Sequence, residues 1–276
     1  MFWNNNCKFV EYKHASSSMK LILPSFLIFC CLYTSRAQQE SSFQAGEWLK
    51  FKLNYSGWVK AGNATLEVKD TNYKDRSVFH VIGKGWTTGA IKWFFKVEDR
   101  YESYFDKATV RPYKFIRKIN EGGHKKNRVV EFDYKKNLAV VSDLRHQTKK
   151  FVKIKPDIQD MVSAYYYLRD HYDTQKIKVG EVVKLNMFFD NEIFGFKLKF
   201  LGLETIDTKF GNINCLKFRP YVLAGRVFHE EESVTLWVTA DQNKIPIKIK
   251  ADLRVGSIRS DLEAFKGLKY PFKIQL

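Results

Sequence analysis

The chain has 276 residues, of which 45% are hydrophobic, and this length can bury a hydrophobic core without the help of disulfide bonds. It carries 47 Lys and Arg residues against 30 Asp and Glu residues, which gives a formal net charge of +17. In a cytosolic protein such a charge would indicate a nucleic-acid partner, and the export signal described next argues against that partner.

The first 37 residues have the pattern of an upstream segment followed by a secretory signal peptide. An apolar run, Leu21–Tyr33, follows Lys20, and Ser35 and Ala37 place small residues where a signal peptidase requires them. The apolar run is too short and wrongly flanked for a membrane-spanning helix. We therefore predict cleavage of residues 1–37, with Met19 as a natural translation start, and an exported chain without a transmembrane span.

The positive charges of the remaining chain are spread along its length, and no run of five like charges occurs. Two interpretations fit an exported protein: attraction to anionic lipid or polysaccharide of the cell envelope, or a lysine-rich face in contact with water. The even spread favours the second interpretation.

A single cysteine, Cys215, remains after the predicted cleavage, so an internal disulfide is excluded. It lies in the segment 212–218, which alternates like a strand and places Ile213 on the same face. We predict a buried apolar position for Cys215 and no catalytic thiol.

Alternation of apolar and polar residues predicts a series of strands before residue 156. The glycine-rich segment Gly83–Gly89 matches no phosphate-binding motif, and we interpret its glycines as bends or bulges in a curved sheet. The connections between these strands are short, which is typical of an up-and-down antiparallel sheet. The predicted strands are 47–55, 64–69, 78–82, 96–105, 111–119, 129–134, 138–142 and 151–154.

One long helix is predicted over residues 157–172, with Asp157 as N-cap and Asp160 in the first turn. Its apolar residues recur at steps of three and four, so one stripe of the helix must pack against an apolar surface. Tyr165, Tyr166 and Tyr167 make the helix unusually aromatic. Packing in the core is the favoured role of this stripe, and contact with a ligand is the alternative.

Strands resume after the helix, at 181–190, 194–205, 213–220, 227–239, 245–253 and 257–265. A shift of 134 residues, the separation of Gly46 and Gly180, also carries Pro112 onto Pro246 and Gly122 onto Gly256. Strand alternation alone does not produce such landmarks at one spacing. We predict that residues 38–276 form a single domain of two similar halves, about 46–123 and 180–257, joined by an extra meander and the helix.

These patterns together predict a mainly β fold. We expect a strongly curved antiparallel up-and-down sheet that forms an open or half barrel, with one central α-helix packed on it. Two similar β modules are an alternative arrangement of the strands.

Several segments share the pattern of one family: Phe43 with Gly46, Glu47, Leu49 and Tyr55; Ala61, Gly62, Ala64 and Leu66; Asp160–Arg169; Leu236–Asp241; and Ile245, Pro246 and Val255–Ile258. They resemble the domain-of-unknown-function family 3108. The resemblance spans the chain after the leader, and it implies an exported bacterial β protein of a Gram-negative envelope, without any assigned activity.

No segment predicts a catalytic or metal site. The histidines are scattered, and His229 with the acidic residues 230–232 lies in a strand-like context and does not form the helical HExxH zinc motif. No nucleophile motif is present, and neighbouring carboxylates on a strand face opposite ways. We therefore predict a non-enzymatic protein without cofactor. Asp160, Arg169 and Asp241 are predicted to be buried polar partners that stabilise the fold.

The remaining signal is aromatic, because the chain holds more large rings than a small core needs. We predict that an apolar cavity lies between the sheet and the helix and binds a lipid or another apolar ligand in the periplasm or at the periplasmic face of the outer membrane. The alternative is an envelope scaffold that binds a protein partner through sheet faces or edges. The candidate ligand-binding residues are Trp86, Trp93, Phe94, Tyr165, Tyr166 and Trp237.

Overall fold

The computed structural model describes residues 40–174, 176–222 and 234–275, and these form fifteen strands and two short helices. The prediction of a mainly β fold is confirmed. The predicted leader, His229 and the acidic residues 230–232 lie outside the described residues, as does the first part of the strand predicted at 227–239. None of the described helices is long and apolar enough to cross a membrane.

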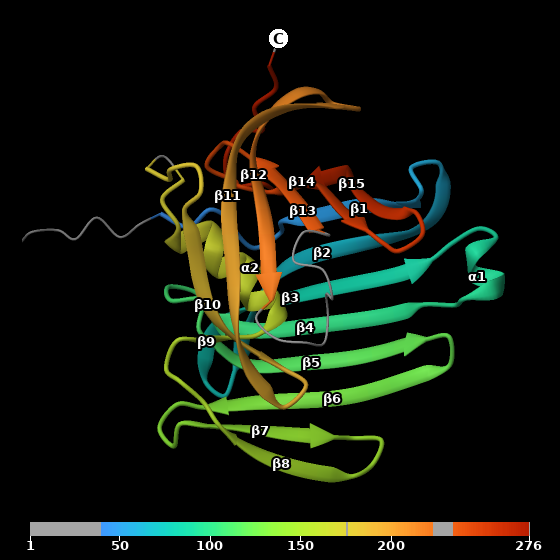
Figure 1. The fold of residues 1–276 in the computed structure, drawn as a ribbon. Helices are drawn as coiled ribbons and strands as arrows, with labels where there is room; N and C mark the ends of the chain where they lie inside the picture. Colours follow the sequence, from blue (N-terminus) through green and yellow to red (C-terminus); the bar gives the residue numbers. More distant parts are fainter. Residues whose placement is uncertain (1–39, 175, 223–233, 276) are drawn as a thin grey trace, which may run out of the picture. The chain divides into compact units, whose positions relative to one another are not determined.

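All fifteen strands belong to one sheet (Figure 1). The two stretches predicted to be similar therefore share a single sheet. The first run of strands is β1 (Trp48–Tyr55), β2 (Val59–Tyr73), β3 (Arg76–Thr87), β4 (Glu98–Asp106), β5 (Pro112–Glu121), β6 (His124–Asp133), β7 (Leu138–Asp143) and β8 (Thr148–Lys153). The second run is β9 (Ile158–Gln159), β10 (Val182–Phe189), β11 (Glu192–Thr208), β12 (Gly211–Val222), β13 (Val234–Thr239), β14 (Pro246–Asp252) and β15 (Ser257–Lys266).

Within each run, every strand pairs with its neighbour in sequence, and the two runs meet where β1 pairs with β15. The sheet is not closed, because β8 and β9 each have a neighbour on one side only. All pairs are antiparallel except β9 with β10, which is a short parallel pair. The expected up-and-down arrangement therefore holds inside each run, and one long-range seam joins the two runs.

Many of the strands form where the sequence alternates, because one face of such a strand lies against the core. In β1, Leu49 and Phe51 are buried whereas Lys52 is exposed. The interpretation of Gly83–Gly89 as bends needs correction for its first part, because β3 continues through Thr87. Its glycines are held in the extended conformation by pairing with both β2 and β4, which residue propensity alone does not reveal.

One glycine in β2 is required by close backbone packing. Beside the irregularity in the pairing of β1 with β2, Gly62 lies so near β3 that an added Cβ would overlap the backbone oxygen of Trp86. Any larger residue there would push the two strands apart, so this position requires glycine. The irregular pairing lies beside Gly62, and not at Gly83 or Gly85 of β3.

The expectation of one helix is corrected in two respects. A second helix, the single turn α1 (Ile91–Phe94), connects β3 to β4. The long helix α2 (Met161–His171) begins four residues later than predicted, because Ile158 and Gln159 instead pair with β10. Its N-cap is Asp160, and not Asp157.

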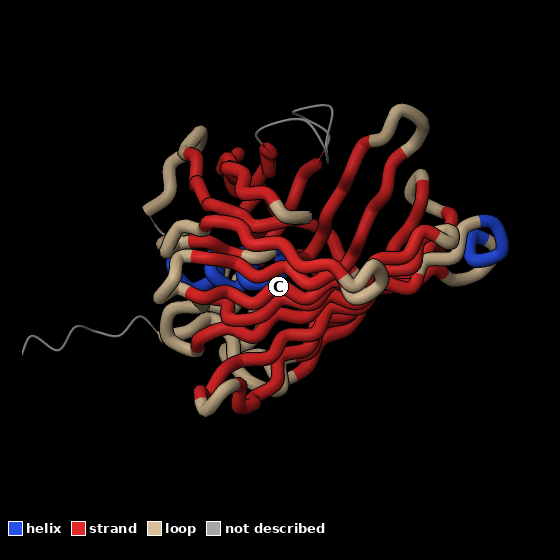
Figure 2. The backbone as a smooth tube through the Cα atoms, turned by 90° about the horizontal axis from the view of Figure 1, so that it is seen from below, coloured by secondary structure: helices blue, strands red, loops and turns tan. Residues whose placement is uncertain are grey.

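Helix α2 lies between the two runs of strands (Figures 1 and 2). Val162 and Tyr166 belong to the largest cluster of buried side chains, which is built mainly from β3 to β7. Leu168 packs against a second cluster, built from β11, β12 and β13. A third cluster surrounds Trp237 and Cys215. The helix therefore supplies apolar contacts to both runs.

Candidate functional site

The start of α2 is fixed by a buried carboxylate. Asp160 Oδ1 accepts hydrogen bonds from the backbone amides of Val162 and Ser163 at 2.8 Å each, and the Ser163 hydroxyl closes a capping box. Asp160 Oδ2 accepts a 2.6 Å hydrogen bond from the Ser103 hydroxyl, which attaches the helix to β4. Burial raises the pKa of Asp160 to about 6, and these hydrogen bonds only partly oppose that effect.

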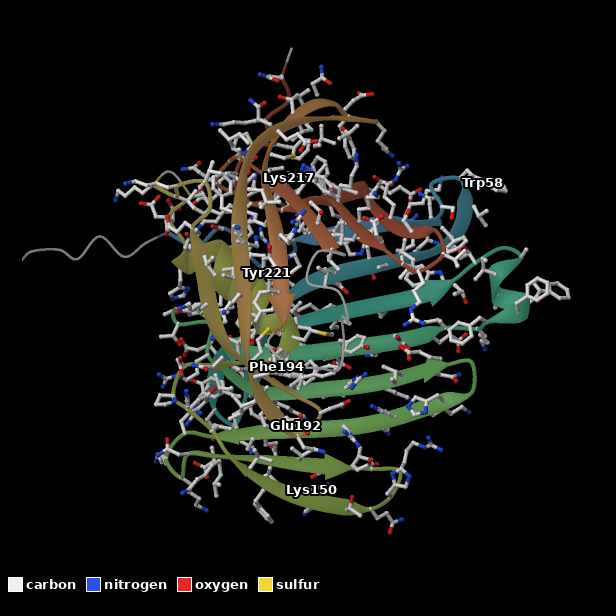
Figure 3. The ribbon with its side chains drawn as sticks, in the orientation of Figure 1. Trp58, Lys150, Glu192, Phe194, Lys217 and Tyr221 are labelled. Carbon is white, nitrogen blue, oxygen red and sulfur yellow. The ribbon has the colours of Figure 1, made fainter. Side chains whose placement is uncertain are left out.

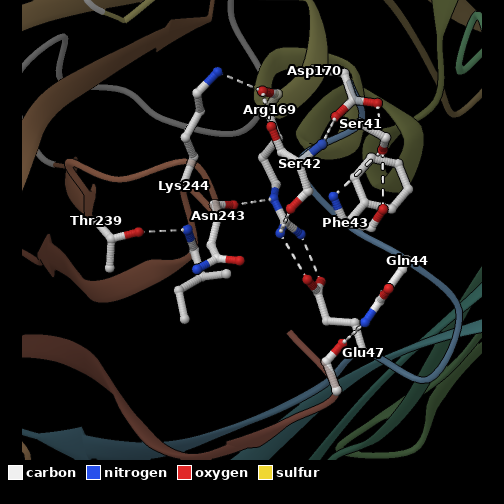
Figure 4. Close-up of polar contacts among 12 residues, drawn as sticks. Ser41, Ser42, Phe43, Gln44, Glu47, Arg169, Asp170, Thr239, Asn243 and Lys244 are labelled. Atoms are coloured by element: carbon white, nitrogen blue, oxygen red, sulfur yellow. Dashed lines mark hydrogen bonds and ion pairs between the residues drawn. The ribbon is translucent and has the colours of Figure 1, made fainter. Parts of the chain in front are cut away.

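The other end of α2 is held by a buried ion pair (Figure 4). Arg169 donates to both carboxylate oxygens of Glu47, at 2.6 and 2.7 Å, and both side chains are almost completely buried. It also donates to the backbone oxygens of Asn243 at 2.8 Å and Ser42 at 3.0 Å. Burial alone would lower the pKa of Arg169, but the Glu47 carboxylate holds it above its ordinary value. One guanidinium thus connects the helix to the stretch before β1 and to the loop that carries Asn243.

Asp241 organises the loop that carries Asn243. Its carboxylate accepts hydrogen bonds from the Thr239 hydroxyl at 2.6 Å and from the amides of Asn243 and Lys244 at 3.0 and 3.1 Å. Asn243 then presents its carbonyl to Arg169. The three predicted polar residues therefore lie at the two ends of α2 and in the loop beside it, and each stabilises a backbone turn or a helix end.

Tyr166 fills the core below α2. Its ring packs edge-on against Phe43 at 4.6 Å between centroids and lies 5.7 Å from Phe105. The side chain is fully buried, and its hydroxyl has no hydrogen-bond partner among the described residues. This ring is part of the packed interior and does not contact the cavity described next.

An open cavity of about 410 Å³ lies between α2 and the inner face of the sheet. This volume falls within the range of about 300–1,000 Å³ that is common for small-molecule sites. Its walls are mostly apolar and come from both runs and from the helix, and they include Phe51, Leu66, Tyr101, Tyr165, Leu236 and Ile249. The space between helix and sheet is therefore hollow near the start of α2, and further along the helix it narrows to a cavity of about 50 Å³ beside Leu168 and Tyr172.

Two glycines of β3 lie in the cavity wall, and one of them provides room. Gly83 and Gly85 are opposite Leu66 and Ala64 of β2. A Cβ added at Gly85 would meet no atom within 4 Å, so a side chain at this position would extend into open space. At Gly83 an added Cβ would meet the Leu66 side chain at 3.3 Å, so the free space lies beside Gly85.

Asp99 supplies a titratable group to the polar side of the cavity. It pairs with Gly85 across β3 and β4 and accepts a 3.1 Å hydrogen bond from the amide of Asn120. Burial raises the pKa of Asp99 to about 6, and Glu121 adds to this effect. The cavity therefore combines a broad apolar wall with a carboxyl group that gains or loses a proton near pH 6.

A cluster of charges joins the tip of the β10–β11 hairpin to the first run. Asp190 accepts hydrogen bonds from Arg117 at 2.6 Å, Lys126 at 2.9 Å and Arg128 at 3.0 Å. Burial opposes ionisation of Asp190, but the hydrogen bonds from Lys126 and Arg117 outweigh it and hold the pKa below its ordinary value. This cluster was not predicted from the sequence, because its members are far apart in the chain. The turn signal Asp190-Asn191 was its only local sign.

Only one of the six aromatic residues predicted to bind a ligand lines this cavity, namely Tyr165. Its ring lies 5.3 Å from the Arg169 guanidinium, and its hydroxyl has no hydrogen-bond partner among the described residues. Tyr166 is in the core, and Trp237 is buried in another cluster, where its indole nitrogen donates to Glu204 at 3.2 Å.

The other three predicted aromatic residues lie toward one end of the sheet. Trp86 is in β3, opposite Glu98 of β4, on the face turned away from Gly85. Trp93 and Phe94 are almost fully exposed on α1. Their prediction as cavity residues is corrected, because α1 carries them outside the sheet. Within the described residues, no group of three or more His, Cys, Asp or Glu side chains could hold a metal ion.

Solved structures that resemble this chain have low sequence identity to it. A β-barrel-like protein of the domain of unknown function DUF1849 from Brucella abortus aligns with a TM-score of 0.54 and 9% identity, over 81% of this chain and 98% of that chain. A protein from Bacteroides fragilis, described as a candidate exported protein with a YmcC-like fold, has a TM-score of 0.32 and 10% identity, over 81% and 97% of the two chains. A DUF1089 family protein from Pseudomonas aeruginosa has a TM-score of 0.34 and 8% identity, over 66% and 87%.

The first of these likenesses supports the fold alone, because its identity is far too low to transfer a function. No curated protein sequence matches this chain. A family match covers most of the chain, from residue 50 to residue 263, and it confirms the resemblance described above. The chain belongs to the family described as protein of unknown function DUF3108.

Proposed function

We propose that this protein binds an apolar ligand with a hydrocarbon chain in the cavity between α2 and the inner face of the sheet. The observation that carries the proposal is the open cavity of about 410 Å³ with a mostly apolar wall, into which Gly85 projects no side chain. A gap of this size normally lowers stability, because its lining loses packing contacts. A bound acyl chain would restore those contacts, and this gives the gap a use.

The ligand would contact residues of both runs and of α2. Phe51 and Leu66 come from the first run, Leu236 and Ile249 from the second, and Tyr165 from the helix. The polar end of such a ligand, a carboxylic acid or an alcohol, would lie near Asp99, where a protonated carboxyl can donate a hydrogen bond.

The alternative, a scaffold that binds partners through a sheet edge, has less support. The edge strand β8 contains Lys149, Lys150 and Lys153, and most of its residues are exposed. Lysines on an edge strand discourage the addition of another strand, because pairing would bury their charges. The cavity is therefore the stronger basis for a function.

We also propose that the two halves arose by duplication and that the chain acts after export, in the periplasm or at the periplasmic face of the outer membrane. The strand positions support duplication, since a shift of 134 residues carries the first residue of β1 to β6 to within two residues of the first residue of β10 to β15. The predicted signal peptide is the support for export.

The proposed function can be tested by filling the cavity. Gly85→Val adds a β-branched side chain to a strand position with free space, so we expect it to keep or raise stability by up to about 1 kcal/mol. Protein purified from its own host should yield a bound lipid in native mass spectrometry and solvent extraction, and the variant should yield about tenfold less. The fluorescent fatty acid cis-parinaric acid should show the same loss.

Ser77→Val is the matched control, because it adds the same side chain to an exposed position of β3 that does not line the cavity. It should leave both ligand content and probe binding unchanged. If the wild-type protein carried no lipid and did not bind the probe, or if Gly85→Val bound as well as the wild type, the proposal would be refuted.

A further inference from the structure

Exposed apolar side chains gather at one end of the sheet. Helix α1 connects β3 to β4 there and projects beyond the strands (Figure 1). Trp93 and Phe94 are each 88% exposed, and Phe95 is 52% exposed. Rings of this size are normally buried. Several exposed rings on one helix therefore indicate a surface that contacts another apolar phase.

Two neighbouring turns extend this surface. Trp58, between β1 and β2, is 83% exposed and lies at the same end as α1 (Figure 3). Val255, between β14 and β15, is 76% exposed. Backbone hydrogen bonds join these connections to neighbouring strand ends, because Ser56 N donates to Ser257 O of β15 at 2.8 Å and Thr88 N donates to Ala61 O of β2 at 3.0 Å. The aromatic and aliphatic side chains therefore belong to one continuous end of the sheet.

The opposite ends of the same strands have a different composition. The connections from β2 to β3, from β4 to β5 and from β6 to β7 are made by residues 74–75, 107–111 and 134–137. Among these, Val110 is fully buried, and none of the large hydrophobic side chains found exposed in the described chain lies in them. The concentration of exposed rings is thus a property of one end and not of the turns in general.

Basic residues surround the exposed rings. Lys92 and Arg254 are exposed in the connections from β3 to β4 and from β14 to β15, and Lys60 is exposed at the start of β2 at the same end. Two acidic residues at this end form ion pairs with other lysines, since Glu98 pairs with Lys96 at 3.0 Å and Asp252 pairs with Lys250 at 2.9 Å. Tryptophan and phenylalanine beside exposed cations are the composition that binds the headgroup region of anionic bilayers.

We propose that this end, formed by Trp58, Trp93, Phe94 and Val255 with Lys60, Lys92 and Arg254, docks on the surface of an anionic lipid bilayer. The rings enter the boundary between headgroups and acyl chains, and the cations contact lipid phosphates. This inference goes beyond ligand binding and does not require the cavity to be occupied. Docking would bring the cavity close to the bilayer. Gly85 lies only two residues before Thr87, where β3 ends beside the docked surface.

Flotation with vesicles tests the proposal on the full protein purified from its own host. We expect binding to vesicles of phosphatidylethanolamine with phosphatidylglycerol and weaker binding to phosphatidylcholine alone. Trp93→Ala with Phe94→Ala should lower the partition coefficient by roughly tenfold or more, because two inserted rings are lost. Lys92→Glu with Arg254→Glu should weaken binding to the anionic vesicles, and added salt should weaken binding of the wild type.

A matched control removes two equally exposed hydrophobic residues elsewhere. Leu203 is 72% exposed in β11 and Phe151 is 67% exposed in β8, and Leu203→Ala with Phe151→Ala should leave the partition coefficient unchanged. Unchanged thermal unfolding of each variant shows that its fold is intact, since all these positions are on the surface. Gly85→Val should bind vesicles like the wild type, which separates this proposal from the cavity.

The proposal is overturned if the wild-type protein does not float with anionic vesicles, or if the control variant loses as much binding as the variant of α1. A second readout is the quenching of tryptophan fluorescence by brominated acyl chains. It should be strong in the wild type and lost when Trp58 and Trp93 are both replaced by phenylalanine. Equal quenching in that variant would place the inserted rings elsewhere and refute the assignment.

Discussion

Replacing Arg169 by methionine would remove the cation from the buried ion pair with Glu47. The carboxylate would then stay in the interior without its two hydrogen bonds of 2.6 and 2.7 Å. The backbone oxygens of Ser42 and Asn243 would also lose their donor. We expect Arg169→Met to lower the free energy of unfolding by about 3–5 kcal/mol, the usual loss when one partner of a buried pair is removed. That is a large share of the roughly 5–15 kcal/mol available to a typical domain.

Urea unfolding of single and double variants measures this effect. Glu47→Met added to Arg169→Met removes the isolated charge, so the double variant should be more stable than Arg169→Met by about 2 kcal/mol. Arg169→Lys keeps the positive charge but not the paired geometry, and it should fall between the wild type and the methionine variant. If Arg169→Met cost less than about 1 kcal/mol, or if the two single losses were additive, the pair would not hold the helix as described.

Two further predictions follow from buried titratable groups. Burial raises the pKa of Asp160 to about 6 from an ordinary 3.8, so its contribution to stability is complete below about pH 4 and is lost as the pH rises through 6. Asp160→Asn should remove this part of the fall in unfolding free energy between pH 4 and pH 7, and a variant with the wild-type slope would contradict the assignment. Burial also raises the pKa of Cys215 to about 12, so a thiol reagent should not react with the native protein at pH 8 and should react after unfolding in urea. Rapid labelling of the native protein would show that Cys215 is accessible.

The sequence predicted most strands because their pattern is local. A strand with one buried face alternates along its own length, as Leu49, Phe51 and Lys52 show in β1. The predictions failed where pairing with distant residues decides the conformation. Ile158 and Gln159 look like the first turn of a helix, but pairing with Asn186 and Met187 draws them into the sheet.

The candidate site was predicted only in outline. The pattern indicated that α2 faces the sheet and that Tyr165 lies between them, which fits its place in the cavity wall. It could not show that Gly85 faces open space, because a glycine in a strand has the same local signature whether it bends the chain or lines a cavity. Trp93 was predicted to line the cavity because it is a large aromatic residue. The single turn of α1 instead carries it into the solvent.

The pairing of β1 with β15 has a consequence for how the chain folds. Trp48 and Lys266 are neighbours in this seam although nearly the whole chain separates them. When the chain is synthesised from its N-terminus, the meander from β1 to β8 can form early. The edge of β1 that pairs with β15 stays free until β15 has been synthesised. Closure of so large a loop is slow, so we expect the seam to form late in folding. During that interval β1 is the edge most open to pairing with a second, unfinished chain.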